Sequence, residues 1–163
     1  MFDATSWVVI APEMFLLFMA CAITLLDLWV SSTRRAPSYW ATQITLLVLA
    51  LWNASHALAL SRPDFPKALY GFGGMVLADA FGSWMKCFAT LALAATLVYA
   101  RPYSAQRQML QRGGELFTLS LFALLGIYTM IAGNHFLVIY LGLELISLSR
   151  FALVALRREH LLA

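Results

Sequence analysis

The chain has 163 residues, of which 62% are hydrophobic and only 12% are charged, and its mean hydropathy is +0.79. This composition excludes an ordinary soluble domain and favours a membrane protein, because five spans of about 20 residues would use nearly the whole chain. The net charge of +3 does not indicate nucleic-acid binding, because the basic residues lie in short loops between apolar runs and form no stripe.

The first predicted span runs from about Ile10 to Val30. Glu13 lies in its first turn, where the positive end of the helix dipole favours an acid, so we expect a capping or interfacial residue. Asp27 lies near the other end of the span, within reach of Arg34 and Arg35 if their side chains extend toward the interface. Both carboxylates are therefore assigned structural roles.

The second predicted span covers residues 38–60 and ends in a segment that cannot be a continuous helix. His56 lies in its distal half, where a single histidine is more often hydrogen-bonded to a neighbouring helix than part of a proton relay. The segment Ser61–Gly74 contains two prolines and three glycines, which predicts a position outside the hydrocarbon. Gly74–Asp79 is expected to form a short extended or amphipathic piece.

The third predicted span covers residues 80–99 and carries Lys86 a few residues inside its start. A flexible stem can lift that ammonium to the interface, so snorkelling is the expected behaviour and a buried charge partner the alternative. The polar segment 101–114 that follows is predicted to be a loop.

The fourth and fifth predicted spans cover residues 115–133 and 135–156. Asn134 alone separates them, so the two helices are expected to be antiparallel neighbours. Glu144 lies near the middle of the fifth span, where a charge costs about 2.5 kcal/mol or more. It is therefore expected either to serve proton or ion movement or to remain protonated in a helix-packing contact.

A polar stripe crosses the fifth span on the face that carries Glu144. Tyr140, Glu144 and Ser147 have the spacing i, i+4 and i+7, which places them on one face of a helix. Arg150 lies about 120° around the helix from Glu144 and is not expected to pair with it. A carboxyl group in a medium of low dielectric constant can be switched by an approaching cation, so Glu144 is a candidate proton-loading site, with Tyr140 and Ser147 in support.

The distribution of basic residues predicts the orientation in the membrane. With the amino terminus outside, seven arginines of the loops and the carboxyl-terminal segment lie inside, against one arginine and one lysine outside. The amino terminus is therefore expected in the periplasm and the carboxyl terminus in the cytoplasm. No nucleotide-binding loop, nucleophile elbow, iron–sulfur spacing or metal-ligand pair is found in the sequence.

The last two spans also resemble a known family. RGGELFTLSLFALLGIYTMIAGNHFLVIYLGLELISLS is similar to the fourth and fifth membrane helices of the subunit N family of the proton-pumping NADH-quinone oxidoreductase, respiratory complex I. The family pattern Leu-Gly-Leu-Glu-Leu-x-Ser-Leu-Ser is matched by Leu141–Ser149. The start of the chain resembles the family's first helix through Pro12, Glu13 and the apolar run to Asp27, and Gly74–Lys86 resembles the approach to its third. The resemblance extends in order over essentially the whole chain.

The resemblance implies an all-α, polytopic, antiporter-like subunit of the bacterial inner membrane, which contributes to proton translocation coupled to NADH oxidation and quinone reduction. Glu144 occupies the position of the glutamate that pairs with a lysine two helices further on. The implied partners are the lipid bilayer and other membrane subunits of complex I. The chain is expected to bind no cofactor itself, because NADH, FMN, iron–sulfur clusters and quinone belong to other subunits.

Two departures from the family pattern leave alternatives open. Arg150 stands where the family usually has an apolar residue, and the chain ends at Ala163 where the family continues through further helices. We therefore expect one membrane domain, residues 1–163, that is an amino-terminal fragment, a truncated product or a piece of a split subunit and does not pump alone. The alternatives are a subunit of a related cation/proton antiporter or membrane-bound hydrogenase, and a scaffold that contributes only helices.

Overall fold

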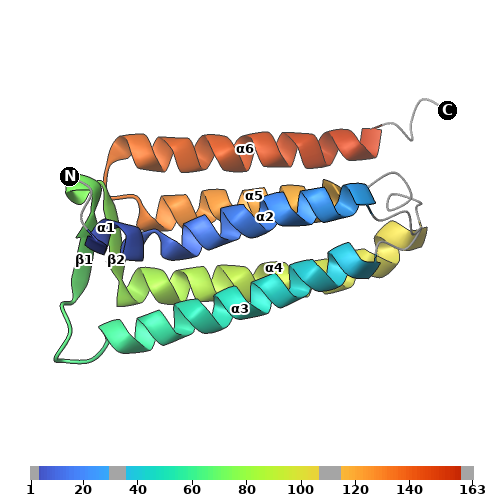
Figure 1. Ribbon diagram of the computed structural model, residues 1–163. Helices are drawn as coiled ribbons and strands as arrows, with labels where there is room; N and C mark the ends of the chain where they lie inside the picture. Colours follow the sequence, from blue (N-terminus) through green and yellow to red (C-terminus); the bar gives the residue numbers. More distant parts are fainter. Residues whose placement is uncertain (1–3, 30–35, 107–114, 159–163) are drawn as a thin grey trace.

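The fold is described by a computed structural model for residues 4–29, 36–106 and 115–158. Within these ranges the elements in chain order are α1 (Ala4–Val9), α2 (Ala11–Trp29), α3 (Ala36–Leu60), β1 (Ala68–Gly71), the 3₁₀-helix η1 (Phe72–Gly74), β2 (Val76–Asp79), α4 (Ala80–Gln106), α5 (Glu115–Ala132) and α6 (Phe136–Arg158). The long helices lie side by side, and the two strands cover one end of the bundle (Figure 1).

Five helices in the described ranges are long and apolar enough to cross a membrane. They are Ala11–Trp29, Pro37–Leu60, Ala80–Ala100, Glu115–Ala132 and Phe136–Ala155. Each bound lies within one residue of the span predicted from the sequence, so the prediction of an all-α polytopic membrane fold is confirmed. The agreement has a simple cause, because a chain in hydrocarbon must satisfy its backbone hydrogen bonds internally and an apolar run of this length does so as a helix. The loop predicted for residues 101–114 was wrong in its first part, because α4 continues as a helix to Gln106.

The interior of the bundle lies between α2, α3, α4 and α5. Its buried residues include Leu16 and Ile23 of α2, Leu46 and Leu49 of α3, and Tyr128 of α5. Large apolar side chains cover much of the outer surface as well, such as Leu28, which is 78% exposed. An apolar exterior around an apolar interior is what a helix bundle in lipid requires.

Helix α6 lies at the edge of the bundle and packs mainly against α5 (Figure 1). The two helices approach closely at Gly126 and Gly142. A Cβ atom at Gly126 would lie 2.8 Å from the carbonyl oxygen of Gly142, and a Cβ atom at Gly142 would lie 2.9 Å from the carbonyl oxygen of Gly126. Small residues permit this backbone approach, which is a principal source of helix association in lipid. The predicted antiparallel α5–α6 pair is confirmed.

The two strands form an antiparallel hairpin in which Ala68 pairs with Asp79 and Gly71 with Val76. The turn between them requires positive φ at Gly73 and Gly74, at 66° and 88°. β2 agrees with the extended piece predicted for Gly74–Asp79, but β1 lies in a segment predicted only as irregular. Four residues are too few to show a strand periodicity in the sequence.

The hairpin is joined to both neighbouring parts of the bundle. The amide of Phe72 donates a hydrogen bond to the Ser6 hydroxyl of α1 over 3.1 Å. Asn134, in the α5–α6 turn, donates from its backbone amide to the Met75 carbonyl over 2.9 Å and from its side chain to the Gly74 carbonyl over 2.8 Å. The hairpin therefore ties the amino-terminal helix to the turn that precedes α6.

Candidate functional site

Glu144 lies eight residues after the start of α6, about 12 Å along the helix axis, and near the centre of the apolar stretch Phe136–Ala155. Its side chain is half-buried. Gly142 and Ser149 are buried on the side of α6 that meets α5, whereas Leu148 is exposed on the outer side. Glu144 thus lies at the border between the packed side of α6 and the side that faces away from the bundle.

The structure brings Tyr140 and Glu144 together one helical turn apart. Their side chains interact, and Tyr140 is 52% exposed. Ser147 is half-buried on the next turn, and the hydrogen bonds of the described residues include none between it and Glu144. Arg150 is exposed and forms no ion pair with Glu144 among the described residues, as the helical spacing predicted.

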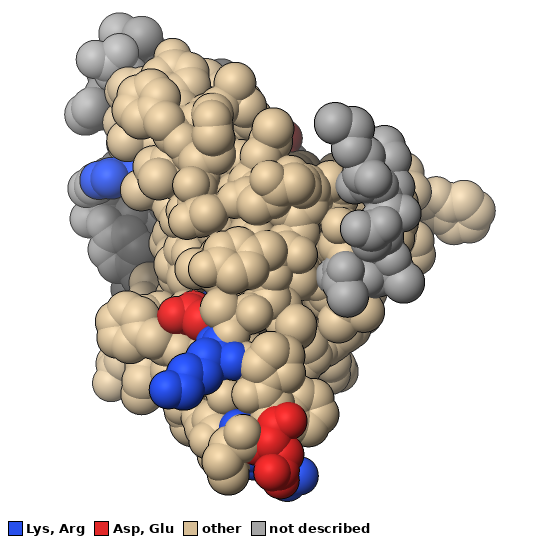
Figure 2. Space-filling view, turned by 90° about the vertical axis from the view of Figure 1, so that its left-hand side faces the viewer, with Lys and Arg blue, Asp and Glu red and all other residues tan. Residues whose placement is uncertain are grey.

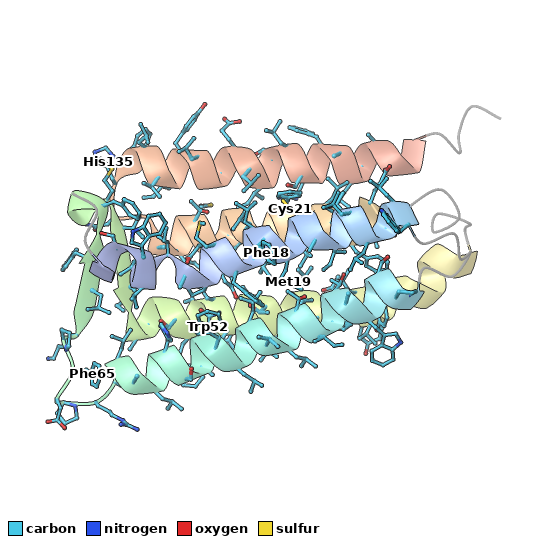
Figure 3. The ribbon with its side chains drawn as sticks, viewed as in Figure 1. Phe18, Met19, Cys21, Trp52, Phe65 and His135 are labelled. Carbon is cyan, nitrogen blue, oxygen red and sulfur yellow. The ribbon has the colours of Figure 1, made fainter. Side chains whose placement is uncertain are left out.

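The outer side of α6 carries a run of large apolar side chains. Figure 3 shows side chains along α6 that project away from the bundle, with His135 at the start of the helix. The exposed apolar residues of this helix are Phe136, Leu137, Ile139, Leu141, Leu143, Leu148, Phe151 and Val154. Tyr140 and Glu144 are therefore polar groups on a helix surface that is mainly apolar up to Arg150, and an ionised carboxylate there requires a nearby positive charge or a water-filled cavity.

A second polar cluster, which the sequence analysis did not assign, lies inside the bundle. Nζ of Lys86 on α4 is 2.5 Å from Oε1 of Glu13 on α2, and the two side chains are only 6% and 13% exposed. Lys86 therefore does not snorkel, and Glu13 is an ion-pair partner and not a capping acid. The expected snorkelling of Lys86 and the capping or interfacial role expected for Glu13 were therefore wrong, whereas the buried charge partner kept as the alternative for Lys86 is confirmed. Both expectations failed because each residue was considered on its own helix.

The same cluster continues to α5 and α3. Nζ of Lys86 lies 5.6 Å from the centre of the Tyr128 ring, within the range of a cation–π contact. The Tyr128 hydroxyl receives a 2.9 Å hydrogen bond from Nδ2 of Asn53 and shares a 2.5 Å hydrogen bond with the Thr90 hydroxyl. Asn53, Thr90 and Tyr128 are fully buried.

The sequence did contain a signal for the Glu13–Lys86 pair. α2 and α4 both begin at the hairpin end of the bundle, and each carries one charged residue of opposite sign within its first two turns. Two opposite charges at similar depth that face the same bundle interior satisfy each other more cheaply than either does alone in lipid. The missing information was that α2 and α4 face each other across the interior formed with α3 and α5.

Two other predicted groups have local partners. Oδ1 of Asp27 receives a 2.7 Å hydrogen bond from the Ser38 hydroxyl of α3. Arg34 and Arg35, its expected partners, lie outside the described residues. His56 packs against Trp52 of its own helix, with ring centres 6.3 Å apart, and the hydrogen bonds of the described residues include none from its ring to a neighbouring helix. Among the described residues, no three His, Cys, Asp or Glu side chains are grouped as metal ligands.

Comparison with curated proteins supplies a family relationship. This chain is 54% identical over 159 residues to NADH-quinone oxidoreductase subunit N of Polaromonas naphthalenivorans, which covers 98% of this chain and 30% of that protein. It is 42% identical to the protein of the same name from Herminiimonas arsenicoxydans, over 94% of this chain and 30% of the relative. The chain matches the amino-terminal portion of subunit N.

A third relative, subunit N of Nitrosomonas europaea, is 41% identical over 93% of this chain and 30% of its own length. The resemblance noted in the sequence is therefore confirmed. The chain spans about 30% of the length of each of these subunit N proteins. No family model matches it.

Proposed function

We propose that this chain is part of a membrane subunit of a proton-translocating NADH-quinone oxidoreductase and that Glu144 is its proton-loading residue. The similarity to subunit N across 98% of the chain supports the assignment to that complex. The observation that carries the role of Glu144 is its position near the centre of the apolar stretch of α6, at the border of the packed face.

The chemistry proposed for Glu144 is reversible protonation without covalent change. In hydrocarbon the neutral acid is the cheaper form, and a positive charge brought close stabilises the carboxylate, so the proton is bound and released as that charge moves. The supporting role proposed for Tyr140 rests on its interaction with the Glu144 side chain from one helical turn away. Ser147 lies one turn on the other side and contributes a hydroxyl group to the same stripe.

The reaction and the partners follow from the same proposal. The relatives are named as subunits of an oxidoreductase for NADH and quinone. NADH, FMN, iron–sulfur clusters and quinone would act in other subunits of the complex, and this chain would bind none of them. Its partners would be other membrane subunits and the lipid bilayer of the bacterial inner membrane.

The proposed orientation places the hairpin end of the bundle in the periplasm. α2 ends, α3 begins, α4 ends, α5 begins and α6 ends at the opposite end, so the predicted cytoplasmic arginines all belong to segments attached there (Figure 1). Arg62 and Lys67 belong to the segment at the hairpin end, and Figure 2 shows charged side chains gathered at the edge of that end. The excess of arginine opposite the hairpin supports a cytoplasmic location for that end.

The test of the proposed function is Glu144→Gln in the full-length subunit, within the assembled complex reconstituted into liposomes. Glutamine keeps the shape of the side chain and removes its titration, so we expect normal assembly with a loss of NADH-driven proton pumping of about tenfold or more. Glu115→Gln, an exposed carboxylate in the first turn of α5, is the matched control and should pump normally. Normal pumping with Glu144→Gln would show that Glu144 is a packing residue.

A further inference from the structure

The Glu13–Lys86 pair is buried inside the bundle, and both residues belong to helices long and apolar enough to cross a membrane. Lys86 is six residues after the start of α4, about 9 Å along the helix, and it is 4% exposed. Glu13 meets it from the first turn of α2, and α1 lies between that turn and the hairpin (Figure 1). Ionisable residues within membrane spans are costly and often take part in proton or ion movement. A buried pair is also weak evidence of stabilisation, because apolar replacements are often as stable.

The hydrogen bonds of the pair leave room for a proton. Oε1 of Glu13 accepts a hydrogen bond from Nζ of Lys86, whereas Oε2 is buried and has no hydrogen-bond partner among the described residues. An ammonium group has three N–H donors, and the described residues show a hydrogen bond for one of them. The Glu13 carboxylate can therefore accept a proton at its unused oxygen. It can also be neutralised by a proton from the Lys86 ammonium.

A buried framework around Tyr128 restricts the position of Lys86. The Tyr128 ring faces Nζ, and the hydroxyl of the same tyrosine is held by Asn53 from α3 and Thr90 from α4. Thr90 in turn donates a 2.7 Å hydrogen bond to the Lys86 carbonyl. Tyr128 is thus a positioning residue that restricts where the ammonium can move.

The pair lies at a similar level of the bundle to Glu144. A Cβ at Gly126 would meet both Gly142 and Ile146, so residue 126 of α5 lies opposite residue 144 of α6, and Tyr128 lies about 3 Å further toward the hairpin end. Because the Tyr128 ring contacts Lys86, the buried pair and Glu144 lie at similar depth on two sides of α5. Glu13 and Glu144 are therefore two carboxylates at similar depth, one buried inside the bundle and one at its edge.

We propose that Glu13 and Lys86 form a second proton-exchange site in this protein. A proton taken up at Oε2 of Glu13 turns the carboxylate into a carboxylic acid beside the Lys86 ammonium. Transfer from Nζ of Lys86 to Glu13 instead turns the charged pair into a neutral amine and acid, with no covalent bond between heavy atoms changed. Its role in pumping rests on the function proposed above.

The decisive variants separate proton exchange from ion pairing. Lys86→Arg keeps the positive charge but cannot release a proton, because guanidinium remains protonated in proteins. Glu13→Gln with Lys86→Met removes both charges together and leaves neither unpaired, a replacement that buried pairs often tolerate. Lys67→Arg, on an exposed lysine outside the bundle, is the control for the same substitution.

Each variant is measured in the full-length subunit, in the complete complex in liposomes with a pH-sensitive dye. We expect amounts of assembled complex close to the unmodified level and pumping reduced about tenfold or more in Lys86→Arg and in the double variant, with Lys67→Arg unchanged. Normal pumping in either assembled variant would overturn the proposal. It would show that the pair serves only structure, which Lys86→Arg preserves through its positive charge and the double variant through its packing. Glu144→Gln is measured in parallel. If it abolishes pumping while the Lys86 variants pump normally, only this inference fails.

Infrared spectroscopy decides the case in which a variant does not assemble. The difference spectrum of the unmodified complex with and without NADH should contain a carboxylic-acid band that shifts when Glu13 is replaced by aspartate. The absence of a band sensitive to Glu13→Asp would overturn the proposal.

Discussion

Replacing Gly126 by alanine tests whether close backbone packing fixes α6 on the bundle. The added Cβ would lie 2.7 Å from Cγ1 of Ile146, 2.8 Å from the Gly142 carbonyl oxygen and 3.0 Å from the Ile146 backbone nitrogen. Two of these three atoms belong to the backbone of α6, so no change of rotamer can remove the overlap and the helices must separate. Overpacking of this kind costs about 2 kcal/mol, within the usual range of 1–3 kcal/mol. Alanine regains about 1 kcal/mol of helix propensity.

The expected net effect is a loss of about 1 kcal/mol in the free energy of unfolding. The assay is unfolding of the purified chain in mixed micelles by titration with SDS, followed by circular dichroism. Ala95→Gly, at an exposed position within α4, measures the propensity contribution in the same medium. A gain in stability for Gly126→Ala, equal in size to the loss for Ala95→Gly, would show that propensity alone operates and that the close contact is absent.

Combining the two glycine substitutions gives a further check on the contact. A Cβ at Gly142 would meet the Gly126 carbonyl oxygen and the Met130 backbone nitrogen, at 2.9 Å and 3.0 Å. Either alanine forces the same separation of α5 and α6, so Gly126→Ala with Gly142→Ala should cost less than the sum of the two single effects. Strict additivity would contradict a shared contact.

Three further outcomes are expected. Tyr128→Phe should cost about 1 kcal/mol in the same titration, because it removes the hydroxyl that binds Asn53 and Thr90; an effect below about 0.3 kcal/mol would contradict a buried network there. Reporter fusions after residues 112 and 158 should be cytoplasmic and a fusion after residue 64 periplasmic, and any reversed result would mean that the orientation or a span is wrong. Gly74→Ala should destabilise the hairpin by about 1–2 kcal/mol because φ is 88° at this position, and faster amide hydrogen exchange at Leu77 would report it.

The sequence predicted the membrane spans closely because they depend on local composition alone. An uninterrupted apolar run of about 20 residues has one stable form in lipid, and the prolines and glycines after Leu60 end that form. The antiparallel pairing of α5 and α6 could be predicted for an equally local reason, since the turn around Asn134 is too short for any other arrangement.

Features that depend on which helices are neighbours could not be predicted in the same way. The Glu13–Lys86 pair joins residues 73 positions apart, and each residue alone fitted an interfacial role. The framework around Tyr128 requires α3, α4 and α5 to meet at one point. Glu144 could be found from its own helix, because a carboxylate in the middle of an apolar span is rare. Its half-buried place at the border of the α5 contact is a property of the bundle.

The attachment of the α5–α6 turn to the hairpin has a mechanical consequence for α6. The two hydrogen bonds of Asn134 hold the turn at the hairpin, so a tilt of α6 about this attachment would have its pivot at the first residue of the helix. A rotation of 5° about that end would displace Arg158, about 33 Å away, by about 3 Å, but Glu144, about 12 Å away, by only about 1 Å. Forces applied at the distal end of α6 would therefore reach the carboxylate reduced about threefold in amplitude, on the scale of one hydrogen bond made or broken.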